Sequence, residues 1–150
     1  MPVGIDTFAY RRDLPHLAKN GKTYFVTFRA KRFLAPDDRT IVQRHCVYEH
    51  EKTCWLDCLV VMPDHVHFIA TPYEPWFLSR LMQRMKSVSA HEVTHTNGVR
   101  GALWQHESFD HILRSEESLA KKVEYVCQNP VRAGLVSTPE EYPWLWRAVR

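Results

Sequence analysis

Segments rich in β-branched and aromatic residues predict four strands, and segments with apolar side chains at three- and four-residue spacing predict three helices. The predicted strands are residues 23–29, 55–62, the run MPDHVHFIAT that opens with the turn at Pro63-Asp64, and 109–114. The predicted helices open at 36–38, run from 77 to about 97, and run from 115 to about 128. The chain therefore alternates strand, helix, strand, strand, helix, strand, helix.

Start and stop signals support the three helices. Asp37 and Asp38 follow Pro36, which is a favourable arrangement for a helix N-terminus, with Asp at the cap. The second helix carries an apolar stripe that predicts core packing, and Asn97-Gly98 is a suitable C-terminal cap. Ser115 followed by two glutamates caps the third helix, which should end near Gln128 because Pro130 disfavours helical geometry in the residue before it.

The first six elements match the split β-α-β-β-α-β arrangement, in which two helices cover one face of an antiparallel sheet. We therefore expect an α+β fold in a single domain spanning residues 1–150. Residues 1–20 are predicted to be a basic N-terminal extension, and residues 131–150 a tail that packs back on the domain.

Composition narrows the class of protein only slightly. A hydrophobic content of 45% with a net charge of +3 is typical of a globular domain and permits a nucleic-acid partner without arguing for one. No apolar stretch reaches the length of a membrane span and no secretion signal is visible, so we expect a cytoplasmic protein without a membrane partner. The four cysteines lack paired C-x-x-C spacing, which indicates reduced, partly buried thiols.

The most informative polar residues are His65 and His67. Side chains alternate in a strand, so both histidines point to one face while Val66 and Phe68 point to the other. Two imidazoles on one rigid face can bind a single divalent metal. On spacing alone, two half-exposed surface histidines are an equally good interpretation.

Tyr125 is the second candidate. The apolar side of the third helix is formed by Leu119, Ala120, Val123, Val126 and Cys127, and Tyr125 lies off that side, close to Lys121 and Gln128. Position alone favours a ring that packs under the C-terminal tail. A phenol is a poor nucleophile at neutral pH, but a metal on a phosphodiester would activate its target. Asn129, four residues after Tyr125, could then supply a third metal ligand.

Four segments carry a family resemblance. MPDHVHFIA, WQHESFDHILR, VEYVCQNPVRAGLV and EEYPW together resemble the single-tyrosine HUH transposases, most closely the REP-associated tyrosine transposases of bacteria. The resemblance spans roughly residues 24–144. It implies a ferredoxin-like (RRM-like) sheet with the histidine pair on a central strand, Mg²⁺ or Mn²⁺ as cofactor, and a tyrosine on a C-terminal helix. That tyrosine attacks single-stranded DNA near a hairpin and leaves a 5′-phosphotyrosine link and a free 3′-hydroxyl.

Carried onto this chain, the resemblance makes His65 and His67 metal ligands and Tyr125 the nucleophile. Asn129 matches the polar residue that completes the metal site, with Gln128 as a fallback. Asp64 stands where the family often has Asn, and its carboxylate is a candidate partner for one of the histidines. The ending Tyr-Pro-Trp-Leu departs from the family's Tyr-Pro-Trp-Ser, which leaves the role of the tail open.

Two other functions compete with DNA nicking and strand transfer. A nucleotide hydrolase of the His-x-His-x-His kind would need a third histidine where Ile69 stands. A domesticated, non-catalytic binder of single-stranded or hairpin DNA would keep the fold without the chemistry.

The expected partner is hairpin DNA of the repetitive extragenic palindrome kind, bound by a monomer or homodimer. Phosphate contacts are predicted around the tyrosine, and Trp104 is as compatible with base stacking as with the core. The predicted phosphate-binding residues are Lys121, Lys122 and Arg132; further basic residues are Arg11, Arg12, Lys31, Arg32, Arg80, Arg84 and Lys86.

Overall fold

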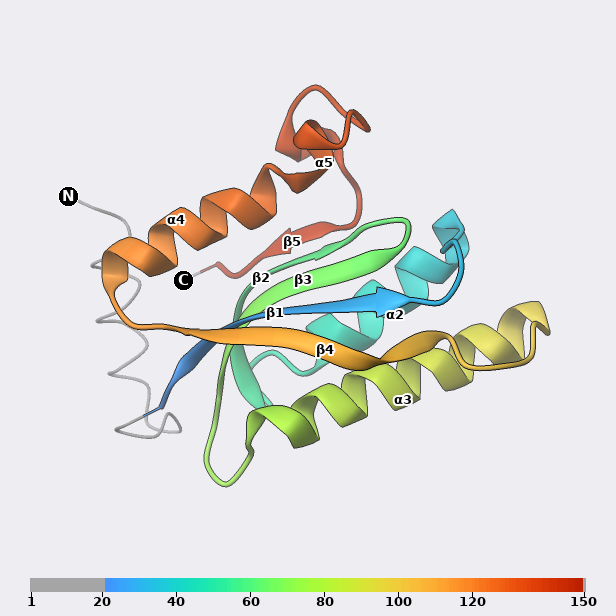
Figure 1. The fold of residues 1–150 in the computed structure, drawn as a ribbon, viewed down its shortest axis with the longest axis horizontal. Helices are drawn as coiled ribbons and strands as arrows, with labels where there is room; N and C mark the ends of the chain where they lie inside the picture. The colour runs from blue at the N-terminus through green and yellow to red at the C-terminus, as the bar shows by residue number, and fades with distance from the viewer. Residues whose placement is uncertain (1–20, 150) are drawn as a thin grey trace.

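A five-stranded antiparallel sheet forms the centre of the protein, which a computed structural model describes for residues 21–149 (Figure 1). The strand order is β4-β1-β3-β2-β5, so the strand that carries the histidines lies in the middle. The strands are β1 (Thr23–Ala30), β2 (Cys54–Val61), β3 (His65–Pro72), β4 (Trp104–Leu113) and β5 (Leu145–Arg147).

Helices cover both faces of this sheet. Figure 1 shows α4 and α5 on the side of the sheet opposite α3. One apolar cluster joins α2 and α3 to the face that carries Val26 and Phe68, and a second joins α4 to the face that carries Phe25 and Ile69. The helices are α2 (Pro36–Tyr48), α3 (Leu78–Asn97), α4 (Glu116–Cys127), α5 (Asn129–Arg132) and the 3-10 turn η1 (Pro139–Glu141).

The register between β1 and β3 fixes which side chains meet on the α4 face. Thr27 pairs with His67, and Arg29 pairs with His65. Because side chains alternate, the neighbouring pair Val26 and Phe68 faces the α2 and α3 side instead. β3 is covered on both faces, which explains why its non-histidine positions are nearly all buried and apolar.

Most predicted elements are present, and the third helix begins as expected: the Ser115 hydroxyl accepts a hydrogen bond from the Ser118 N–H at 3.0 Å. Gly98 ends α3 with a φ of 73°, a left-handed conformation that favours glycine. Three details differ from expectation. β4 begins at Trp104, whereas the predicted strand begins at residue 109. The N-cap of α2 is Ala35, whose N–H donates to the Asp38 carboxylate, so no Asp is itself the cap. Ala120, predicted on the apolar side of its helix, is exposed.

The C-terminal tail packs against β2 and α2. β5 pairs with β2, and the Tyr142 hydroxyl donates to the carbonyl of Val61 at 2.7 Å. Trp144 donates its indole N–H to the Thr40 hydroxyl at 3.0 Å. Tyr-Pro-Trp therefore holds the tail at the end of β2 that leads into the turn before His65.

The four cysteines are free and buried. No helix in residues 21–149 is both long and apolar enough to span a bilayer. The predicted extension at 1–20, with Arg11 and Arg12, lies outside the described residues.

Candidate active site

His65 and His67 lie on the same face of β3, with their ring centroids 4.6 Å apart. His67 is 7% exposed, whereas His65 is half-buried at the open end of the strand. The pair therefore combines a buried ring, His67, with a more accessible ring, His65, at the first residue of β3. Both rings are carried by the same strand.

Each histidine has its Nδ1 engaged by a neighbour. The Thr27 hydroxyl lies 2.7 Å from Nδ1 of His67, and the Asp64 carboxylate lies 2.7 Å from Nδ1 of His65. These contacts leave Nε2 of each ring as the nitrogen for a metal and fix the ring orientations, as supporting residues do in metal sites. Asp64 thus takes the partner position that its sequence context suggested.

Electrostatics keeps His67 neutral. Burial, together with the positive charge of His65, Arg29, Arg132 and Lys122, lowers the pKa of His67 to about 3. A neutral imidazole retains the lone pair that a metal ligand needs, so His67 is ready to coordinate across the physiological pH range.

Tyr125 projects from α4 toward the histidines. Its ring centroid lies 6.0 Å from that of His67 and 6.1 Å from that of Phe25, while 43% of the residue remains exposed. The phenol is therefore next to the face of the sheet that carries the histidines and is open to a ligand. Arg132, at the start of the predicted tail, contacts one side of this ring, but the residue is not covered by the tail.

Two cations surround the tyrosine. The Arg132 guanidinium lies 4.1 Å from the Tyr125 ring centroid and donates to the Tyr125 carbonyl at 2.8 Å. Lys122 Nζ lies 4.9 Å from the same ring. Lys121 lies elsewhere, in an exposed pair with Glu117 at 3.3 Å. The structure thus brings Lys122 and Arg132, but not Lys121, to the tyrosine.

Gln128 and Asn129 stand at the junction of α4 and α5. The backbone stays helical through Gln128 (φ −83°, ψ −5°), which keeps Asn129 one turn after Tyr125. Gln128 lines a separate hollow of about 440 Å³ with Tyr142 and Arg147. Gln128 therefore faces a hollow that contains neither histidine, and the assignment of Asn129 as the third ligand stays a prediction. Among the described residues, no group of three or more His, Cys, Asp or Glu side chains is placed to hold a metal.

A hollow of about 450 Å³ opens beside His67 and Tyr125 toward β4. Of its lining residues, the sequence analysis gave a role to His67 and Tyr125; those that it missed include Thr27, Arg29 and Phe109. The register between β1 and β3 would have identified Thr27 and Arg29, but that register cannot be read from the sequence. Phe109 was assigned to a strand without a role.

The remaining sequence candidates do not line this hollow, although Lys86 contacts two of its lining residues, Gln105 and Ser108, from the α3 side. Arg80, Arg84 and Lys86 belong to α3 on the opposite face of the sheet, and Arg84 bonds to Glu49 at 3.0 Å. Trp104 is 7% exposed and donates to Ser89 at 3.1 Å, so it is a core residue. Lys31 and Arg32 lie in the loop between β1 and α2.

Comparison with known proteins identifies the family of this chain. The chain is similar to a REP-associated tyrosine transposase of Escherichia coli (strain K12), with 27% identity over 140 residues that cover 90% of this chain and 79% of the relative. A solved REP-associated tyrosine transposase bound to a REP hairpin shares the fold, with a TM-score of 0.69 and 23% identity, covering 83% of this chain and 76% of that chain. Residues 23–129 match the family described as "Transposase IS200 like". Because this match extends over most of the chain and contains the histidines, the tyrosine and Asn129, the protein belongs to the IS200-like transposase family.

Proposed function

We propose that this protein cleaves and rejoins single-stranded DNA beside a hairpin, with Tyr125 as nucleophile. The observation that carries the proposal is the placement of the Tyr125 ring, 6.0 Å from the His67 ring and beneath the cationic groups of Arg132 and Lys122. Family membership supports DNA processing of the transposase type. The relative bound to a REP hairpin supports hairpin DNA as the partner.

The residues present fit a divalent metal. His65 and His67 would bind Mg²⁺ or Mn²⁺ through Nε2, because both Nδ1 atoms already have partners. Asn129 would be the third ligand. When bound, the ion would polarise the scissile phosphate and stabilise the charge that develops on it.

The chain itself supplies the nucleophile and the groups that position the phosphate. The Tyr125 phenol, which is exposed, gives its proton to solvent water and forms a bond from Oη to phosphorus, while the bond from phosphorus to the 3′-oxygen breaks. The 3′-oxygen leaves and takes up a proton to become a free hydroxyl. Lys122 and Arg132 hold the phosphate against the phenol, and reversal of the reaction by another 3′-hydroxyl completes strand transfer.

The test is a labelled hairpin oligonucleotide with single-stranded flanks, incubated with Mg²⁺ or Mn²⁺ and separated under denaturing conditions. Wild-type protein should form a covalent protein–DNA adduct, and both Tyr125→Phe and addition of EDTA should abolish it. Tyr48→Phe is a matched control, because Tyr48 is 54% exposed and also has a lysine 4.3 Å from its ring centroid, but lies on α2.

Three outcomes would contradict the proposal. Cleavage without an adduct would mean hydrolysis, and an adduct with Tyr125→Phe would assign another nucleophile. Hairpin binding by the wild type without any cleavage would instead support the domesticated DNA-binding function.

A further inference from the structure

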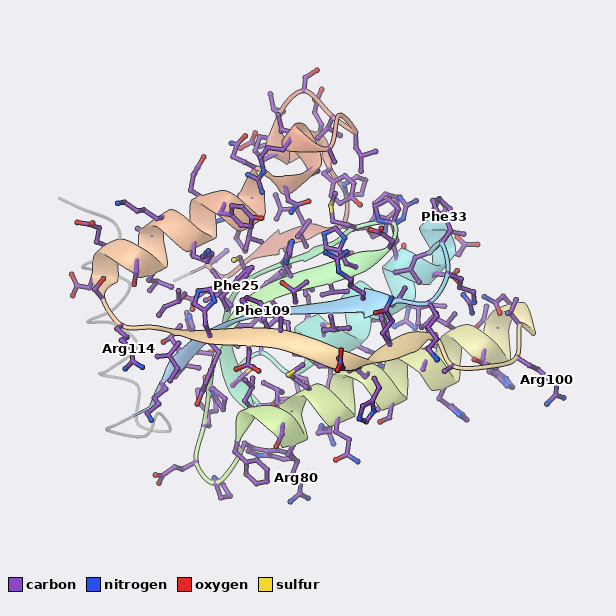
Figure 2. All side chains as sticks on the ribbon, viewed as in Figure 1. Phe25, Phe33, Arg80, Arg100, Phe109 and Arg114 are labelled. Atoms are coloured by element: carbon purple, nitrogen blue, oxygen red, sulfur yellow. The ribbon has the colours of Figure 1, made fainter. Side chains whose placement is uncertain are left out.

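Phe109 is exposed at the rim of the hollow beside Tyr125. It is 58% exposed and belongs to β4, the strand at the edge of the sheet. It pairs with Thr27, whose hydroxyl contacts His67, so Phe109 projects on the same face as the candidate active site. Figure 2 labels Phe109 beside Phe25, between β4 and α4.

The ring of Phe109 is supported from one side and open on the other. Phe25, which is buried, meets it edge-on with centroids 6.5 Å apart, and His111 lies 5.6 Å away. Phe109 belongs to neither of the two apolar clusters of the core. Its ring therefore contributes little to the core and presents an aromatic face to the hollow.

Charge divides the hollow into two ends. The Tyr125 end carries Lys122 and Arg132, which attract a phosphate. The end formed by β4 carries Phe109 and the carboxylate of Glu107, with Arg29 of the neighbouring strand β1 also in the lining. The opposite charges of Glu107 and Arg29 make this end less attractive to a phosphate than the Tyr125 end, and the Glu107 carboxylate can accept a hydrogen bond from a base amino group. Phe25 connects the two ends, 6.1 Å from Tyr125 and 6.5 Å from Phe109.

We propose that the hollow beneath Phe109 is a nucleobase subsite: an unpaired base next to the phosphate attacked by Tyr125 stacks on the Phe109 ring. This inference rests on the proposed function and names the group that positions its substrate. Stacking on an aromatic ring needs no base pairing, and the hollow of about 450 Å³ accommodates a base. Phe109 would thus set which phosphate reaches the phenol.

The experiment uses Tyr125→Phe protein in EDTA, so that binding is measured without cleavage. The probe is a hairpin oligonucleotide with single-stranded flanks, in which 2-aminopurine replaces one flank position at a time. Stacking on Phe109 should change the fluorescence at one position only. Adding Phe109→Ala should remove that change and weaken binding about 5- to 100-fold, the range for loss of one stacked base, whereas Phe109→Trp should preserve both.

Phe77→Ala is the matched control, because Phe77 is 56% exposed but adjoins α3 on the other side of the sheet. It should leave fluorescence and affinity unchanged. The inference is overturned if Phe109→Ala binds as tightly as its parent with the same fluorescence profile, or if Phe77→Ala has an equal effect.

Failure of the inference is distinguishable from failure of the proposed function. If wild-type protein forms the adduct, and Phe109→Ala forms it at the same phosphate and at the same rate, the subsite is overturned but the proposed function is not. A Phe109-dependent fluorescence change, together with no adduct from the wild-type protein in Mg²⁺ or Mn²⁺, would support the subsite and contradict the nucleophilic role of Tyr125.

Discussion

The two histidines of the candidate site differ in how firmly they are held. His67 is buried and contacts Thr27, a residue of the neighbouring strand, while His65 contacts the exposed carboxylate of Asp64, its sequence neighbour. A contact between two strands of a sheet restricts a ring more than one to an exposed adjacent residue. We therefore expect His67 and Thr27 to be the rigid half of the metal site.

Thr27→Val tests this support. The substitution keeps the shape of the side chain but removes the hydroxyl 2.7 Å from His67 Nδ1. We expect about 10- to 100-fold weaker Mn²⁺ binding, measured by calorimetry, and about 1 kcal/mol lower stability. Thr71→Val is the control on β3, because Thr71 also forms a buried hydroxyl contact, to Thr23 at 2.7 Å. It should lose stability without losing metal affinity; equal affinity losses in both would contradict the role of Thr27.

The low pKa of His67 predicts a pH dependence of stability. Below pH 6.5 the unfolded chain takes up a proton at this position, whereas folded His67, with a pKa of about 3, does not. Its contribution to the free energy of unfolding is therefore complete above pH 6.5 and is lost progressively as the pH falls toward 3. Between pH 7 and pH 5, metal-free wild type should lose up to about 2 kcal/mol more than His67→Gln in denaturant titrations. Parallel losses would show that His67 titrates normally when folded.

At the residue scale, the sequence predicted the shared face of the histidines because strand alternation depends only on local geometry. It could not separate Lys121 from Lys122. The two lysines are adjacent residues of the same helix. Only the packing of α4 on the sheet places Lys122 over Phe25 and Tyr125 and leaves Lys121 paired with Glu117.

At the scale of elements, the position of α4 decides whether a site exists. Its amphipathic pattern predicted that it packs on the sheet but not on which face, since apolar side chains line both faces of β2. α4 packs on the face opposite α2 and α3, where the histidines project, and this brings Tyr125 to His67. The start of β4 was missed because residues 105–110 are exposed and polar except for Phe109, as in an edge strand.

The junction of α4 and α5 gives a prediction for the third ligand. Asn129 follows Tyr125 by one helical turn, whereas Gln128 lines the hollow formed with Tyr142 and Arg147. Asn129→Ala should weaken Mn²⁺ binding about 10- to 100-fold, and Gln128→Ala should leave it unchanged. Titration of both variants decides between them, because the reverse result would assign the metal site to Gln128.

At the scale of the whole molecule, the sheet separates two charged regions. The basic residues of α3 lie on one side, where Arg84 contacts Glu49 and Lys86 donates to the Gln105 carbonyl at 2.9 Å. Lys122 and Arg132 lie on the other side with the tyrosine. A net charge of +3 could not reveal this division, because it depends on which helix covers which face.

This division predicts how salt affects DNA binding. Each lysine that contacts a phosphate releases about one counterion, so its loss should lower the slope of log affinity against log salt concentration by about 1. We expect this for Lys122→Gln, since Lys122 lies over the Tyr125 ring where the phosphate is proposed to bind. Lys121→Gln removes the same charge from the adjacent residue, but Lys121 pairs with Glu117, so its slope should match the wild type. Titrations of a hairpin oligonucleotide at several salt concentrations, in EDTA, measure both slopes. Equal decreases in the two variants would mean that the DNA responds to the total charge of α4, and the phosphate would then not be held at the tyrosine by Lys122.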